Sequence, residues 1–310
     1  MNTVLVTGAT GFIGRHALDR LIARGFEVHA VSSRRPLSET ADVTWHVADL
    51  LQPEAVRALL NSVRPSHLLH FAWSVTPAGA PTPDPNFRWV QATLELARDF
   101  AAVGGRRAVL AGSCAEYDWR YGYCVENLTP LVPRSYYGVC KNASRSVCDG
   151  YFSALRVSFS WARIFFVYGP YEPLPRLVPS IVSSLNSRAI AKCTHGEQFR
   201  DYLHVDDVAD ACVALLDTDV NGPINIASGH AVRLRDIAEH IARRLNGEEL
   251  LKLGALPVAP DDPPLIVGDV RRLTSEVGWT PRYTIAAGLD QTVDWWAARL
   301  KTAGVVGCVS

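Results

Sequence analysis

Three glycines that follow the first apolar segment constrain the fold of this chain more than any other feature. Residues 3–7 read Thr-Val-Leu-Val-Thr, a pattern typical of a buried strand, and Gly-Ala-Thr-Gly-Phe-Ile-Gly follows at positions 8–14. From Phe12 to Arg24, apolar residues recur three and four positions apart, which predicts an amphipathic helix. Glycine allows the tight turn that joins a strand to a closely packed helix. The chain is therefore predicted to open with a strand, a tight turn and a helix.

The same alternation of strand and helix continues through the first half of the chain. Short apolar runs predict strands at 27–32, 43–47, 67–73 and 107–113. Helical periodicity covers residues 54–63 and 87–103. Because strands that alternate with helices pair through right-handed crossovers, we predict an α/β fold with a doubly wound parallel sheet of the Rossmann type.

The pattern changes after about Arg163, where prolines begin to cluster and indicate loops or a second lobe. Residues 205–217 and 224–228 nevertheless read as a further helix and strand of the main sheet. We therefore predict a main domain and a smaller C-terminal α/β lobe that is discontinuous in sequence. The predicted ranges are 1–163 with part of 205–228 for the main domain, and 164–204 with 229–300 for the smaller lobe.

Composition argues against several classes of protein. Thirty-one basic residues balance 31 acidic ones without a basic stripe, so we expect no nucleic-acid partner. No apolar run approaches the ~18 residues of a membrane span, and the start lacks the pattern of a signal peptide, so we expect no membrane partner and a cytoplasmic location. The seven cysteines are odd in number and include no Cys-x-x-Cys pair, and His70, His195 and His204 lack ligand spacing. We therefore expect no disulfide framework and no bound metal, with these histidines in packing or surface positions.

The glycine run also predicts a phosphate-binding turn. A strand, a glycine turn and a helix N-terminus together present free N–H groups and a positive dipole end to a pyrophosphate. The residues about 20 positions further on indicate whether NAD or NADP binds, because an acid there would bind the ribose hydroxyl of NAD. Ser32, Ser33, Arg34 and Arg35 stand there instead, and arginines can hold a 2′-phosphate. We therefore favour NADP(H) over NAD(H); the alternative is a pair of solvated loop arginines.

Candidate catalytic residues follow in the middle of the chain. Tyr137 and Lys141 lie four positions apart on a helix predicted to open near Tyr136, so both occupy one helix face. A nearby ammonium would lower the pKa of the phenol and let it exchange a proton near neutral pH. Ser113 ends the predicted strand 107–113, at the sheet edge where ligands bind. The tyrosine and lysine spacing is weak alone, and Ser113 strengthens it.

These motifs resemble the extended short-chain dehydrogenase/reductase family, the nucleotide-sugar epimerases, dehydratases and reductases. The resemblance covers essentially the whole chain, through TGATGFIG, VADL, HFAW, GSCAEYD, YYGVCK, RIFFVYGP, QFRDYLHVDDVA and GWTPRY. It implies that Tyr137 is the general acid/base, that Lys141 binds the ribose, and that Ser113 donates to the substrate oxygen. The implied cofactor-binding residues are Thr7, Gly8, Thr10, Gly11, Phe12, Ile13, Gly14, Ser32, Arg34, Arg35, Asp49, Leu50, Phe71, Ala72, Trp73, Tyr137 and Lys141.

On the substrate side the resemblance implies contacts from Cys114, Phe166, Arg176 and Arg200. Arg200 would contact the nucleotide diphosphate, or else form a structural pair with Asp201 or Asp206. Asp206 and Asp207 are expected to cap a helix and offset its dipole rather than catalyse. Glu172 would lie near the mouth of the cleft, either touching sugar hydroxyls or solvated.

Departures from the family pattern narrow the reaction. The dehydratases carry an Asp-Glu pair where Cys114 and Ala115 stand here, which argues against dehydration. Cys114 would act as a base or, as we favour, pack as a small side chain. Phe166 replaces the usual asparagine, and Ala259 lies near the place of an arginine that often grips the nucleotide.

Three hypotheses follow. The first is an NADPH-dependent reductase that delivers hydride to C4 of a nucleotide-linked 4-keto-6-deoxyhexose while Tyr137 donates the proton. The second is a nucleotide-sugar 4-epimerase that retains NAD. The third is a non-catalytic dinucleotide-sensing protein, which the complete Ser113, Tyr137 and Lys141 set argues against. A homodimer paired through the helices around 87–103 and 137–152 is the expected assembly.

Overall fold

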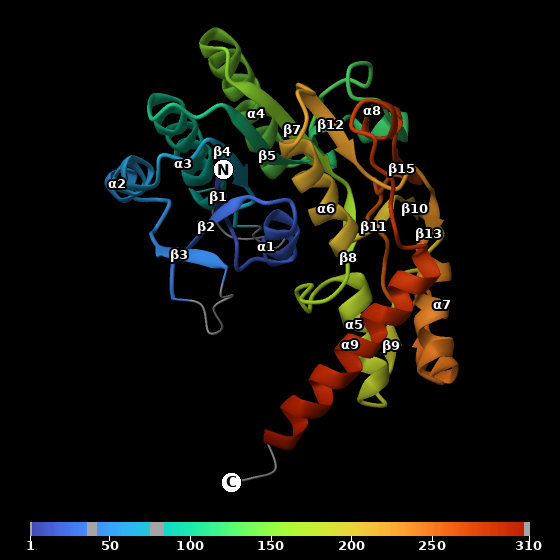
Figure 1. Ribbon diagram of the computed structural model, residues 1–310. Helices are drawn as coiled ribbons and strands as arrows, with labels where there is room; N and C mark the ends of the chain where they lie inside the picture. The colour runs from blue at the N-terminus through green and yellow to red at the C-terminus, as the bar shows by residue number, and fades with distance from the viewer. Residues whose placement is uncertain (1, 36–41, 75–83, 307–310) are drawn as a thin grey trace.

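The computed structural model describes residues 2–35, 42–74 and 84–306, with side chains described as far as Leu300. Figure 1 shows one large sheet with helices on both faces and, beside it, a smaller lobe that carries the C-terminal helix. Among the described residues, no helix is long and apolar enough to cross a membrane.

The large sheet contains seven parallel strands in the order β12-β7-β5-β4-β1-β2-β3. The strand order reverses between β1 and β4, and this is the switch point at which doubly wound sheets bind their ligands. The predicted doubly wound Rossmann fold is confirmed. The strands are β1 (Thr3–Thr7), β2 (Glu27–Ser32), β3 (Val43–Val47), β4 (His67–His70), β5 (Arg107–Ser113), β7 (Ser158–Ile164) and β12 (Gly222–Ile226).

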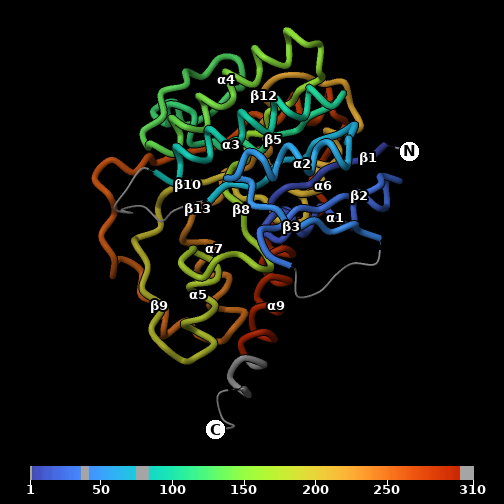
Figure 2. The backbone as a smooth tube through the Cα atoms, turned by 90° about the vertical axis from the view of Figure 1, so that its left-hand side faces the viewer, coloured from blue at the N-terminus to red at the C-terminus, as the bar shows by residue number. Residues whose placement is uncertain are grey.

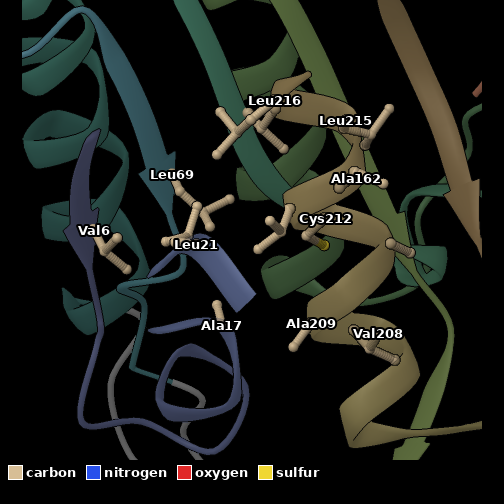
Figure 3. Close-up of a cluster of buried hydrophobic side chains, with 14 of the residues drawn as sticks. Val6, Ala17, Leu21, Leu69, Ala162, Val208, Ala209, Cys212, Leu215 and Leu216 are labelled. Carbon is tan, nitrogen blue, oxygen red and sulfur yellow. The ribbon is translucent and has the colours of Figure 1, made fainter. Parts of the chain in front are cut away.

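Two layers of helices bury this sheet. On one face α1 (Gly14–Ala23) packs beside α6 (Val205–Leu216), and Figure 3 shows Leu21 and Cys212 of these helices directed at strand residues such as Leu69 and Ala162. The other face is covered by α2 (Pro53–Val63), α3 (Asp84–Ala102) and α4 (Tyr136–Leu155). Both faces are therefore dry, which explains why the strands read as nearly continuous apolar runs.

The smaller lobe packs three helices around its own core, visible in Figure 2 beside the main sheet. These helices are α5 (Leu177–Asn186), α7 (Leu234–Arg244) and α9 (Ile285–Val306), and the short α8 (Arg271–Ser275) lies against β12. Its small sheets are β13-β10-β15-β6, β11-β8 and β14-β9. Their strands are β6 (Tyr123–Cys124), β8 (Phe166–Tyr168), β9 (Ala191–Lys192), β10 (Phe199–Arg200), β11 (Tyr202–His204), β13 (Val232–Arg233), β14 (Leu251–Lys252) and β15 (Leu265–Gly268).

Several predicted boundaries were wrong by a few residues. Helix α1 begins at Gly14 rather than Phe12, because Gly8 to Ile13 form the turn. Strand β4 ends at His70 rather than at residue 73, and its last register partner is Leu110. Residues 123–124, inside the range predicted for the main domain, pair with β15 in the smaller sheet. The domain ranges themselves stay a prediction.

Candidate active site

The glycine turn has the shape that a pyrophosphate site requires. Gly8 has a φ of +67°, and a Cβ there would lie 2.7 Å from the backbone nitrogen of Ala72. A Cβ on Gly14 would overlap the carbonyl oxygen of Gly8, so the helix and the turn are in backbone contact. No side chain caps the N-terminus of α1 at Ile13, so no side chain competes with a ligand for the positive end of the helix. The residues present therefore fit a dinucleotide.

The neighbouring strand ends converge on this turn. The Ser32 hydroxyl lies 3.5 Å from the Thr10 hydroxyl and accepts a hydrogen bond from the Arg34 backbone nitrogen, which ties the end of β2 to the turn. The backbone nitrogen of Phe71 donates to the carbonyl of Thr7 at 3.1 Å, while Asp49 is exposed and accepts from Leu51. Thr7 also contacts the buried His70, and the pKa of that imidazole is lowered to about 3 by burial and by the charge of Lys141.

The three predicted catalytic residues do come together. Ser113 ends β5, and its side chain is close enough to the phenol of Tyr137 on α4 to lower the pKa of that phenol. Lys141, one turn further along α4, donates to the carbonyl of Ala111 at 2.9 Å. Its ammonium lies 3.8 Å from the ring centroid of Trp73. Helix α4 can approach the segment that follows β5 because Gly138 has no Cβ. A Cβ there would overlap the carbonyl of Ala115. The side chains of one strand end and one helix face therefore form the site.

The electrostatics of this trio differ from the sequence prediction. We predicted that Lys141 lowers the pKa of Tyr137, but burial is the dominant cause and raises it. The pKa of Lys141 is itself lowered to about 7 by burial, and the Glu116 carboxylate opposes that change. Desolvation outweighs the neighbouring charge because Lys141 is buried and Tyr137 is half-buried. The phenol therefore holds its proton at neutral pH in this structure.

The smaller lobe contributes a second set of side chains. Tyr202 packs against Phe166 with ring centroids 5.6 Å apart. The positive charge of the Arg176 guanidinium acts to lower the pKa values of both Tyr202 and Tyr137, against the larger effect of burial. Glu172 is only 5% exposed, and its Oε2 atom has no hydrogen-bond partner among the described residues. Burial raises the pKa of Glu172 to about 8, with Arg176 acting in the opposite direction. Glu172 is therefore not the solvated carboxylate of the second interpretation.

Arg200 is buried and ion-paired in this structure. It donates to Asp262 at 2.7 Å and to the carbonyl of Pro263 at 2.8 Å, and its guanidinium carbon lies 5.7 Å from the Phe166 ring centroid. The pairing acid is Asp262, whereas the alternative interpretation named Asp201 or Asp206. Asp201 instead accepts hydrogen bonds from the backbone around Ser228. Contact between Arg200 and a diphosphate stays a prediction.

Other expectations needed correction or became sharper. Cys114 is 5% exposed and burial raises its pKa well above the ordinary range, which favours the packing interpretation over a base. The cap of α6 is the imidazole of His204, which accepts from the Asp206 backbone, so neither Asp206 nor Asp207 is the cap. Both aspartates do lie in the first turn of α6, where they offset the helix dipole. No group of three His, Cys, Asp or Glu side chains among the described residues could hold a metal.

The comparisons with known proteins agree with this geometry. The model of the NAD dependent epimerase/dehydratase family matches residues 4–227. The chain belongs to this family. It is thus an enzyme of the extended short-chain dehydrogenase/reductase type, as the motifs implied.

The chain is similar to curated proteins and solved structures that have several different activities. UDP-glucuronic acid decarboxylase 1 of Danio rerio is 24% identical over 96% of this chain and 73% of the relative. GDP-L-fucose synthase 1 of Arabidopsis thaliana is 32% identical, over 52% of each chain. The structure of MoeE5 with UDP-glucuronic acid and NAD is 28% identical with a TM-score of 0.84, covering 96% of this chain and 100% of that one. The Thermus thermophilus UDP-glucose 4-epimerase with NAD, at 24% identity, covers 95% and 98% with a TM-score of 0.85, and it shows the shared fold.

Sequence reasoning missed two members of the site. Glu116 and Arg163 form a fully buried ion pair at 2.8 Å directly behind Ser113. Both stand in segments that we quoted for the resemblance, yet neither received a role. The available signal was chemical: an arginine inside the apolar strand 158–164, and an acid three residues after Ser113 in a serine and glutamate pattern typical of a capping box.

Proposed function

We propose that this enzyme is an NADPH-dependent reductase that acts at C4 of a nucleotide-linked 4-keto-6-deoxyhexose. The observation that carries the proposal is that Ser113, at the end of β5, comes together with Tyr137 and Lys141 of α4, and that burial raises the pKa of the Tyr137 phenol. A reductase needs this group only as an acid, whereas an epimerase needs it first as a base. The Arg34 and Arg35 turn next to Ser32 supports NADPH, and Cys114 with Ala115 argues against dehydration.

The residues of the chain have separate tasks in this mechanism. Tyr137 donates its proton to the oxygen at C4 as the negative charge develops there, and Ser113 donates a hydrogen bond to the same oxygen. The ammonium of Lys141 holds the ribose hydroxyls, and the uncapped N-terminus of α1 holds the phosphates. When it is bound, the nicotinamide supplies the hydride.

A pair of measurements tests the proposal. Fluorescence titration of the cofactor-stripped protein should show tighter binding of NADPH than of NADH. A nucleotide-linked 4-keto-6-deoxyhexose should then oxidise NADPH stoichiometrically, as followed by absorbance. A tightly held NAD with no net change in absorbance would contradict the reductase.

A nucleotide-sugar 4-epimerase is the second candidate, and the Ser113, Tyr137 and Lys141 arrangement favours it as a related chemistry. It is supported by the similarity to the Thermus thermophilus epimerase complexed with NAD. The discriminating measurement is interconversion of C4 epimers without net cofactor consumption.

We also propose that the enzyme works as a homodimer through α3 and α4. Val139, Val147 and Tyr151 of α4 are exposed apolar side chains, and a groove of about 240 Å³ lies between the two helices. Sedimentation should show a dimer in the wild type and a monomer in Val147→Glu, because a buried carboxylate at a two-fold contact is repeated and unpaired.

A further inference from the structure

Glu116 is a fully buried carboxylate beside the active site, and both of its oxygens accept hydrogen bonds. It is 0% exposed and is the last residue of the 3-10 helix η1 (Cys114–Glu116), which follows β5. Its Oε1 atom accepts from the backbone nitrogen of Ser113 and from the indole of Trp161, both at 2.8 Å. Its Oε2 atom accepts from Arg163, also at 2.8 Å. The ion pair with Arg163 and the two further hydrogen bonds hold the carboxylate in one position.

The hydrogen bond to Ser113 makes Glu116 part of the segment that presents the catalytic hydroxyl. Ser113 and Glu116 form a reciprocal capping box: the Glu116 side chain binds the Ser113 backbone, and the Ser113 hydroxyl accepts from the backbone nitrogen of Ala115 at 3.2 Å. The backbone dihedral angles of Ser113 are thereby constrained from both ends. The position of its hydroxyl relative to Tyr137 follows from that constraint.

Neighbouring strands anchor Glu116 in turn. The indole of Trp161 on β7 reaches it over Gly112, where any Cβ would overlap the ring nitrogen. Arg163, also on β7, donates to the phenol of Tyr117 at 3.1 Å, and that phenol donates to Asn225 on β12 at 2.7 Å. The carboxylate is therefore fixed to three adjacent strands rather than to a loop.

Charged and titratable groups face Glu116 from each packed element. Arg163 of β7 pairs with it, Tyr117 and Cys114 lie on its own segment, and Lys141 and Tyr137 lie on α4. Among the causes that act on Lys141, the Glu116 carboxylate is the one that opposes burial. The negative charge of Glu116 thus favours the ammonium form of a lysine that burial would otherwise neutralise.

We propose that Glu116 is a positioning residue of this active site, which holds Ser113 in place through the capping box. The inference rests on the proposed chemistry of Tyr137 only for its kinetic consequence. The placement of Ser113 stands on the hydrogen bonds above, and the electrostatic part is the further expectation that the carboxylate favours the ammonium form of Lys141. Without Glu116, Lys141 loses its proton at a lower pH, and Ser113 is less well oriented.

The first test measures Lys141 directly and needs no substrate. The sequence has four lysines, Lys141, Lys192, Lys252 and Lys301, so the carbon next to each amine can be resolved by NMR of the 13C-lysine-labelled protein. We expect the titration midpoint of Lys141 to fall in Glu116→Gln. The matched control is Glu126→Gln, a buried carboxylate that accepts from the Asn225 backbone at 3.0 Å and does not contact Ser113. An unchanged midpoint in Glu116→Gln, or an equal fall in the control, would overturn the electrostatic part.

The second test reads the kinetic consequence. In Glu116→Gln we expect kcat to fall about 10-fold with KM little changed, because orientation and not substrate binding is lost. The high-pH limb of the rate profile should move to lower pH. Unchanged kcat and an unchanged limb would contradict the positioning role.

A third variant guards against simple misfolding. Glu116→Gln leaves the Arg163 guanidinium buried and unpaired, so Glu116→Gln/Arg163→Met removes both charges together. A folded double variant in which kcat still falls about 10-fold supports the positioning of Ser113, and one with the wild-type kcat overturns it. If the wild-type enzyme oxidises no NADPH, the proposed function fails while the NMR result still decides the role of Glu116.

Discussion

Two buried glutamates, one in each lobe, have opposite surroundings. Glu116, on the main-domain side, is paired with Arg163 and receives three hydrogen bonds of 2.8 Å. Glu172, at the start of the smaller lobe, keeps an oxygen without a partner among the described residues, and its pKa is raised to about 8. On the main-domain side of the site the buried carboxylate is thus held by an ion pair and hydrogen bonds. On the side of the smaller lobe the protonation of the buried carboxyl group depends on its surroundings.

The largest expected effect tests whether Tyr137, which lies between these two regions, is the proton donor. Tyr137→Phe should lower kcat by about 1,000-fold, because the proton donor is lost while the ring stays in place. Steady-state kinetics with NADPH and the ketone measure the loss, and fluorescence titration of NADPH separates any loss of cofactor binding from the loss of the proton donor. Activity above a tenth of the wild type would assign the proton to another group.

The next effect sharpens the contrast in stability. Glu116→Gln should lower the free energy of unfolding by about 3–5 kcal/mol, since it leaves Arg163 buried and unpaired. Glu172→Gln should not lower it at pH 8, because the neutral amide replaces a carboxylate that burial disfavours. Urea unfolding of both variants makes the comparison, and equal losses would break it.

The third prediction concerns pH. Burial raises the pKa of Glu172 from 4.5 to about 8, so the folded protein retains a proton that the unfolded chain loses. Glu172 therefore costs stability as pH rises from about 4.5 to about 8, by at most roughly 5 kcal/mol. The difference between wild type and Glu172→Gln, measured across this window, isolates the contribution from those of His70 and Lys141. A difference independent of pH would show that Glu172 is ionised throughout.

The smallest effect concerns the cofactor end of the main domain. Arg34→Ala should weaken NADPH binding about 10-fold and leave NADH binding unchanged, because only NADPH carries the 2′-phosphate. Parallel fluorescence titrations with both cofactors measure the ratio. Equal weakening of both would favour a general role for this turn, and no change would favour a solvated arginine.

Much of this molecule was predictable from the sequence, because the relevant signals are local. The glycine turn, the helix periodicity and the Tyr137 and Lys141 spacing each depend on residues within one or two turns of one another, so they specify the Rossmann domain and the catalytic helix. The end of a parallel strand also predicts the sheet edge where a ligand meets the protein, which is why Ser113 was found.

Only the tertiary structure decided how the buried charges are arranged. Glu116 and Arg163 are 47 positions apart, and Arg200 and Asp262 are 62 apart, so their pairing depends on which strands and loops become neighbours. The predicted direction of the Tyr137 pKa shift was wrong for the same reason. The sequence spacing shows that a lysine is near, but the burial that raises the pKa depends on the whole fold. Desolvation is a property of everything packed around a group, and that information is not contained in any short segment of the chain.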